Sequence, residues 1–170
     1  VFTLGSSVVR VAKHFWRESL DAVHRLGARA VLLAGPEADA LRAAVSGDDT
    51  HRSRVVVVAG APHSLLFPRA SAVVQQCGIG TLAQSLRSGR PMLGVPFAHD
   101  QPDNAARVRS LGMSRTLYPS HYRGPRVARE LGALLADERY TAAAARVATI
   151  VRSERGVDAA CDALERTSRL

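Results

Sequence analysis

The chain has 170 residues, a length that suits a single domain with an ordinary hydrophobic core. Its formal net charge is +8 at pH 7, and all of its basic residues except Lys13 are arginines scattered along the sequence. Nucleic-acid binding usually shows as a basic patch with interleaved aromatic residues, but aromatic residues make up only 5% of this chain, so we expect no nucleic-acid partner.

The first third of the chain predicts alternating strands and helices. Short apolar runs predict strands at Val1–Leu4, Ala30–Leu33 and Val55–Ala59. Helical spacing predicts helices from Val11 to Leu26 and from Pro36 to Val45, followed by a surface loop at Ser46–Asp49. Val55–Ala59 is a continuous run rich in β-branched residues, which is typical of a parallel strand buried on both faces.

The central stretch carries the most informative turn. Val73 and Val74 end an apolar run and predict a buried strand that stops at two glutamines. Cys77–Thr81 then places two glycines before a predicted helix, Leu82–Ser88, which Gly89 ends. A helix N-terminus attracts anions, so this turn predicts a phosphate site, although such turns also serve packing alone.

The remaining sequence continues the alternation and then becomes helical. We predict strands at Met92–Val95 and Arg115–Leu117, and helices at Pro102–Leu111, Arg126–Ala136, Thr141–Arg152 and Gly156–Arg166. This order predicts an α/β fold, a doubly wound parallel β-sheet flanked by helices, with a helical C-terminal segment. Gly5, Pro62, Gly78 and Pro96 each follow a strand, so their loops should meet at one edge of the sheet.

Four blocks at that edge occur in a distinctive order: Gly5-Ser6-Ser7, Ala61-Pro62-His63, Gln76 to Thr81, and Asp100-Gln101. Together they resemble the donor-binding signature of the nucleotide-sugar glycosyltransferases of the GT-B fold, in particular its bacterial UDP-glycosyltransferase-like members. The resemblance covers nearly the whole chain. It implies that residues 1–170 form one Rossmann-like donor-binding domain, the C-terminal half of a two-domain enzyme whose N-terminal acceptor domain is absent.

The resemblance also implies roles for individual residues. The diphosphate-binding set is Ser6, Ser7, Gln76, Gly78, Gly80 and Thr81, the base- and ribose-binding set is Ala61, Pro62, His63 and Gln84, and the sugar-binding pair is Asp100 and Gln101. Simpler roles remain open: Ser6 or Ser7 could cap a helix, His63 could be a turn residue, and Asp100 and Gln101 could begin the next helix.

Three positions depart from the family's usual pattern. Gln76 stands where the family usually has histidine, and its amide can donate a hydrogen bond but carries no positive charge. Gly60 stands where an aromatic residue often stacks on the nucleobase. Gln84 stands where many members have glutamate, which accepts from ribose hydroxyls more strongly than an amide does. These departures concern donor affinity and base identity.

The implied activity is transfer of a hexose, with inversion, from a UDP-sugar or dTDP-sugar to a hydroxyl of a small-molecule or lipid acceptor. No metal or other cofactor is expected, and the catalytic base should lie on the N-terminal domain, so this chain alone should be inactive. One alternative is a nucleotide-sugar epimerase half. Another is a non-catalytic nucleotide sensor or scaffold whose donor site has decayed.

Cysteine content and hydropathy predict the location. Cys77 and Cys161 have no metal-ligand spacing, which indicates a reduced, cytosolic protein in which Cys77 is a small residue in a tight turn. No apolar run approaches the ~20 residues of a membrane span, and we expect no signal peptide. We therefore predict a cytoplasmic protein and leave peripheral membrane association open.

Overall fold

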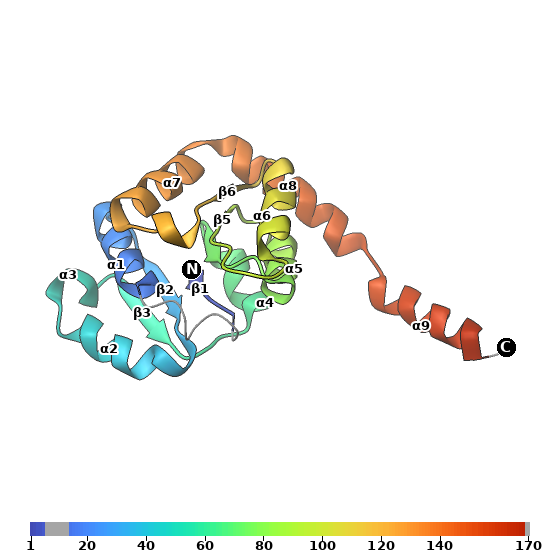
Figure 1. Ribbon diagram of the computed structural model, residues 1–170, viewed down its shortest axis with the longest axis horizontal. Coiled ribbons are helices and arrows are strands. Elements are labelled where there is room, and N and C mark those ends of the chain that lie inside the picture. The colour runs from blue at the N-terminus through green and yellow to red at the C-terminus, as the bar shows by residue number, and fades with distance from the viewer. Residues whose placement is uncertain (6–13, 169–170) are drawn as a thin grey trace.

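A parallel β-sheet forms the centre of the computed structural model, which describes residues 1–5 and 14–168 (Figure 1). Within that part of the chain its six strands are β1 (Phe2–Thr3), β2 (Ala30–Leu33), β3 (Val55–Val58), β4 (Val73–Gln75), β5 (Met92–Gly94) and β6 (Ser114–Thr116). They lie in the order β3-β2-β1-β4-β5-β6, and every neighbouring pair is parallel. The order reverses between β1 and β4, so the predicted doubly wound sheet is confirmed.

Helices connect the strands and cover both faces of the sheet. The α-helices are α1 (Phe15–Arg25), α2 (Ala38–Ser46), α3 (Asp49–Arg52), α4 (His63–Leu66), α5 (Ile79–Ser88), α6 (Gln101–Ser110), α7 (Gly124–Ala136), α8 (Glu138–Ser153) and α9 (Gly156–Ser168). Short 3-10 helices are η1 (Gly35–Glu37), η2 (Phe67–Arg69) and η3 (Pro119–His121).

Two hydrophobic cores lie on opposite faces of the sheet because adjacent strand residues point in opposite directions. Leu32 and Val74 belong to the core beneath α1, α2 and α7. Their neighbours Leu33 and Val73 belong to the core beneath η2, α5, α6 and α8. The packing of helices on both faces therefore holds the strands in place, and with them the loops that follow the carboxyl ends of the strands.

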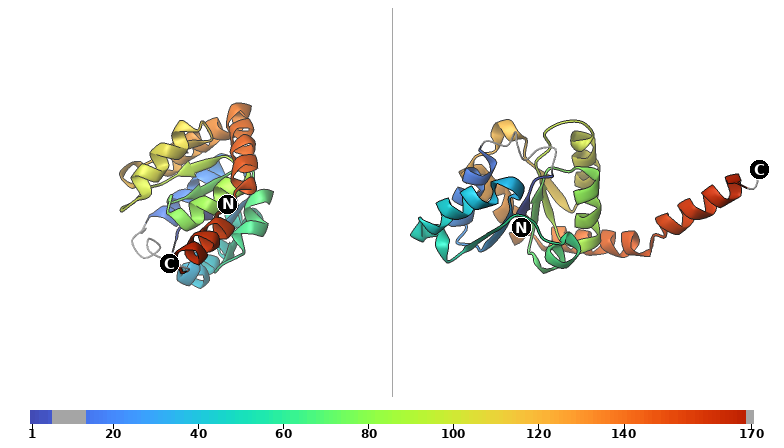
Figure 2. Two further views of the ribbon diagram at one scale, coloured as in Figure 1. Left: turned by 90° about the vertical axis from the view of Figure 1, so that its right-hand side faces the viewer. Right: turned by 90° about the horizontal axis from the view of Figure 1, so that it is seen from below.

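The predicted helical C-terminal segment is confirmed. Helices α7, α8 and α9 follow one another, and α9 extends away from the sheet (Figures 1 and 2). Residues 156–167 of α9 are exposed.

Two predictions about local structure were wrong. β3 is an edge strand, and Val56 on it is 56% exposed, so β3 is not buried on both faces. The predicted loop at Ser46–Asp49 is shorter, because Asp48 accepts from the Thr50 N–H at 2.8 Å and begins α3. The segment after Pro62, for which the sequence analysis named no element, forms α4 and η2.

Candidate functional site

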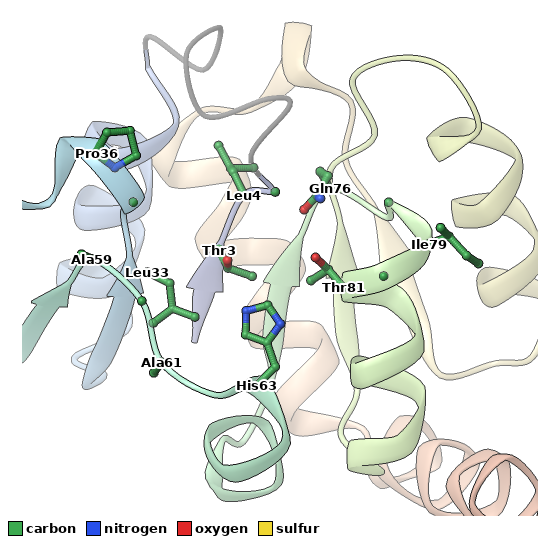
Figure 3. A pocket seen from close by; sticks show the side chains of 15 residues that line it. Thr3, Leu4, Leu33, Pro36, Ala59, Ala61, His63, Gln76, Ile79 and Thr81 are labelled. Atoms are coloured by element: carbon green, nitrogen blue, oxygen red, sulfur yellow. The ribbon is translucent and has the colours of Figure 1, made fainter. Parts of the chain in front are cut away.

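A pocket of about 520 Å³ lies where the strand order reverses, at the carboxyl ends of β1 to β4 (Figure 3). Open parallel sheets bind ligands at this position, because the loops on the two sides of the reversal diverge there. The pocket is lined by Thr3, Leu4, Gly5, Leu33, Gly35, Pro36, Ala59, Gly60, Ala61, His63, Gln76, Gly78, Ile79, Gly80 and Thr81.

The N-terminus of α5 forms one wall of this pocket. The helix begins at Ile79, earlier than the predicted Leu82, because Gly78 is the N-cap and its carbonyl oxygen accepts from the Leu82 N–H at 2.9 Å. No side chain in the described structure caps the first turn, which leaves its N–H groups available to a ligand. A Cβ built on Gly80 meets no atom within 4 Å, so this wall is open to the pocket. The wall suits an anion.

Gln76 lies between the loops that follow β1 and β4. Its side chain is only 4% exposed, although it lines the pocket. Its Nε2 lies 2.2 Å from the position of a Cβ on Gly5 and 3.0 Å from that of a Cβ on Gly78, so both glycines make room for the amide. Among the described residues, nothing bonds to the buried Gln76 Oε1. A buried acceptor without a partner is costly, which favours a ligand group that donates a hydrogen bond to Gln76 Oε1.

The turn between β4 and α5 is held in an unusual conformation. Cys77 is buried and has a φ of 67°, a left-handed value that is uncommon for residues other than glycine. Its N–H donates to Oε1 of the fully buried Gln75 at 2.7 Å. Burial raises the pKa of the Cys77 thiol to about 12, so the thiol stays protonated at neutral pH and is a poor nucleophile. The prediction of a small residue in a tight turn is confirmed.

Gly94 on β5 leaves the space that the Cys77 side chain occupies. A Cβ at position 94 would lie 2.6 Å from Cys77 Sγ inside the core. We therefore expect Gly94→Ala to lower the free energy of unfolding by about 1–3 kcal/mol, the usual cost of overpacking, as measured by urea denaturation. In a Cys77→Ala background the same substitution should cost much less. An equal cost in both backgrounds would contradict this packing.

His63 lines the pocket at the start of α4. In Figure 3 its ring points toward the space between Thr3 and Thr81. The ring stacks on Phe67, with centroids 4.4 Å apart, and burial lowers the pKa of His63 below its usual value. The imidazole is therefore neutral at pH 7 and can offer one donor and one acceptor to a ligand.

The structure brings together half of the residues that the sequence predicts for the site. Ala61, His63, Gln76, Gly78, Gly80 and Thr81 line one pocket. Pro62 is the N-cap of α4, and Gln84 lies further along α5; neither lines the pocket. Ser6 and Ser7 lie outside the described residues.

The sugar-binding pair stays a prediction, because neither residue lines the pocket. Gln101 is buried, and its Oε1 accepts from the N–H groups of Phe97 and Ala98 at 2.8 and 3.3 Å. It therefore shapes the loop that precedes α6. Asp100 is exposed, and its Oδ2 accepts from Asn104 Nδ2 at 2.7 Å.

Sequence reasoning missed several residues around the pocket. Thr3, Gly35 and Pro36 line it, and the rule that loops after parallel strands share an edge could have found them. Gln75 and Asn104 hold the turn after β4, and only the three-dimensional contacts reveal them.

Residues 1–5 and 14–168 contain neither a metal-binding cluster nor a membrane-spanning helix. In this part of the chain no group of three or more histidine, cysteine, aspartate or glutamate side chains could hold a metal ion. In the same residues, no helix combines the length and the apolar character that crossing a bilayer requires.

Comparisons with known proteins agree with this geometry. A family profile described as "UDP-glucoronosyl and UDP-glucosyl transferase" matches residues 1–160. The O-mycaminosyltylonolide 6-deoxyallosyltransferase of Streptomyces fradiae is 31% identical over 167 residues, which cover 97% of this chain and 37% of that protein.

Two solved structures show the same arrangement of elements. The glycosyltransferase of kitacinnamycin superimposes with a TM-score of 0.83 at 26% identity, covering 97% of this chain and 41% of the other. The glycosyltransferase VinC in complex with dTDP superimposes with a TM-score of 0.74 at 25% identity, covering 89% and 37%. The chain thus spans less than half the length of each of these proteins.

Proposed function

The chain belongs to the UDP-glucoronosyl and UDP-glucosyl transferase family, and from this premise we propose that it binds the sugar donor of a two-domain glycosyltransferase. The donor is a nucleoside diphosphate sugar, with UDP or dTDP as the nucleotide. Its diphosphate lies against the N-terminus of α5, and its nucleoside lies toward Gly60, Ala61 and His63.

The observation that carries this proposal is the pairing of two features in one pocket. The first turn of α5 has no side-chain cap, and the buried Gln76 amide lies beside it. Backbone N–H groups at a helix N-terminus favour negative charge, and a buried amide can add a further hydrogen bond. A diphosphate supplies acceptors for both. The dTDP in the VinC structure supports the same class of ligand.

The proposed reaction is hexose transfer with inversion. The bond between the anomeric carbon and the β-phosphate oxygen breaks, and an acceptor hydroxyl attacks the opposite face of the sugar. The leaving diphosphate gains negative charge as the bond breaks, and the N–H groups at α5 stabilise that charge electrostatically. This stabilisation is supplied by the backbone, so we propose a reaction without a metal ion.

The acceptor and its base belong to a separate domain in this proposal. The Cys77 thiol is protonated at neutral pH, and His63 lies on the proposed nucleoside side of the pocket. An N-terminal acceptor domain would therefore supply the base and bind the small-molecule or lipid acceptor. On this proposal the 170-residue chain binds the donor but transfers no sugar alone.

Titration calorimetry on this chain tests the proposal. We expect UDP or dTDP to bind with a dissociation constant in the micromolar to low millimolar range, and the corresponding nucleoside to bind at least tenfold more weakly. The difference would come from the diphosphate at α5. Failure of both UDP and dTDP to bind at millimolar concentration would favour the decayed-site alternative over the transferase.

A further inference from the structure

The turn after β4 is tied to α6 by one side chain, that of Asn104. Its Nδ2 donates to the carbonyl oxygen of Cys77 at 3.0 Å and to Oδ2 of Asp100 at 2.7 Å. Both N–H bonds of the amide nitrogen are therefore used. A single amide connects the residue before α6 with the turn that forms the pocket wall.

Cys77 needs such support because of its backbone conformation. A left-handed conformation is unfavourable for a residue other than glycine and persists only where its surroundings hold it. Gln75 Oε1 accepts from the Cys77 N–H, and Asn104 donates to the Cys77 carbonyl oxygen. Side chains thus fix both polar groups of this residue.

The direction of the Cys77 carbonyl determines the direction of the next N–H. The described chain has no cis peptide bonds, and in a trans peptide the C=O and the N–H point to opposite sides. The Cys77 carbonyl points to Asn104 on α6, so the Gly78 N–H points away from α6. Gly78 lines the pocket, and no described residue accepts a hydrogen bond from its N–H.

We propose that Asn104 is a positioning residue for the leaving diphosphate, because it holds the Cys77 carbonyl and thereby directs the Gly78 N–H into the pocket. Asp100 takes part by orienting the Asn104 amide. The inference rests on the proposed function, since it assigns the diphosphate as the acceptor of the Gly78 N–H. It also gives Asp100 an effect on the nucleotide that is separate from any contact with the sugar.

Two variants remove the bond to Cys77, and one variant serves as the matched control. Asn104→Leu removes the donor, and Asn104→Asp keeps the size but replaces the donor with a carboxylate. The control is Asp103→Asn on the same helix, which loses only the exposed ion pair with Arg107. Calorimetry with UDP, dTDP and inorganic pyrophosphate should show about tenfold weaker binding for both Asn104 variants and unchanged binding for the control.

An exchange variant separates positioning from charge. Asp100→Asn combined with Asn104→Asp keeps the net charge and can keep the bond between the two side chains. It leaves the Cys77 carbonyl without its donor. We therefore expect this variant to bind UDP, dTDP and pyrophosphate about tenfold more weakly than the wild-type chain. Recovery of wild-type affinity in this variant would overturn the proposal, because it would show that only the bond between residues 100 and 104 matters.

The amide resonance of Gly78 gives a direct readout that a purely structural role would not change. In the wild-type chain we expect this resonance to shift strongly downfield when UDP or dTDP is added, and in Asn104→Leu the shift should be lost while the other resonances keep their dispersion. If Asn104→Leu does not fold, Asn104→Asp and the exchange variant provide the same comparison.

The outcomes distinguish this inference from the proposed function. If the wild-type chain and the Asp103→Asn control bind UDP or dTDP but the Asn104 variants bind equally well, the positioning role is overturned and the donor site stands. If none of the proteins binds UDP, dTDP or pyrophosphate, the proposed function fails, and the inference fails with it.

Discussion

Gly80→Asp is expected to weaken nucleotide binding strongly while leaving the fold intact or slightly more stable. A carboxylate at this position would lie in the first turn of α5, beside the proposed diphosphate. Two unit charges about 4 Å apart repel by roughly 4 kcal/mol at an effective dielectric constant of about 20. We therefore expect UDP and dTDP to bind roughly 30-fold to 1,000-fold more weakly, as measured by calorimetry.

The Gly80→Asp variant should be more stable than wild type, although it binds nucleotide more weakly. A Cβ at position 80 meets no other atom, so the side chain fits without strain. Replacing glycine in a helix and placing an acid near the N-terminus each stabilise by a fraction of a kcal/mol, so the melting temperature should rise by roughly 1–4 °C.

Gly80→Asn is the matched control, because it has nearly the same size and no charge. Its nucleotide affinity should stay within a few-fold of wild type. The loss of affinity in Gly80→Asp should become smaller at high salt, because salt screens the charge repulsion, and the affinity of Gly80→Asn should not show this effect. A Gly80→Asp variant that binds UDP and dTDP as tightly as wild type would remove the α5 N-terminus from the site.

Most of the fold could be predicted because local signals and packing agree. The alternation of strands and helices predicted the doubly wound sheet, and Gly89 ends α5 with a φ of 70°, as its position in the sequence predicted. The exposure of Val56 could not be predicted in this way. A run of valines is equally apolar at the centre and at the edge of a sheet, and only the strand order places β3 at the edge.

The residues of the site were harder to predict than its location. Parallel topology brings the loops after β1, β2, β3 and β4 to one edge, so His63 and Gln76 were predictable as neighbours. The direction in which a polar side chain points depends on the hydrogen bonds available to it. Gln101 points into its own loop because the N–H groups of Phe97 and Ala98 need an acceptor, and no periodic pattern in the sequence carries that information.

Gln76 illustrates how the structure changes the meaning of a departure from the family pattern. The sequence suggested that a glutamine in place of histidine could weaken a phosphate contact. The structure shows its amide enclosed between Gly5 and Gly78, positions that a Cβ would crowd. The long, neutral side chain of Gln76 thus fits the space that its two glycine neighbours leave. This fit favours a site that still binds the donor over a site that has lost donor binding.

This matching predicts that Gly5→Ala should weaken nucleotide binding without unfolding the chain. The new Cβ would lie 2.2 Å from Gln76 Nε2, the far end of a flexible side chain that can move aside. Displacing the amide would remove the proposed hydrogen bond from Gln76 Nε2 to the diphosphate and place the side chain in the pocket. We expect UDP and dTDP to bind about 5-fold to 30-fold more weakly in calorimetry, at a cost of roughly 1–2 kcal/mol, with little change in melting temperature.

A double variant, Gly5→Ala with Gln76→Ala, tests whether Gly5→Ala weakens nucleotide binding by displacing the Gln76 amide. Gln76→Ala alone should lose a similar amount of affinity, because the amide is gone. Adding Gly5→Ala to Gln76→Ala should then cost nothing further, since the Cβ no longer meets Nε2. If the two losses add instead, the methyl group at position 5 obstructs the nucleotide itself, and the Gln76 amide has no role in holding the diphosphate.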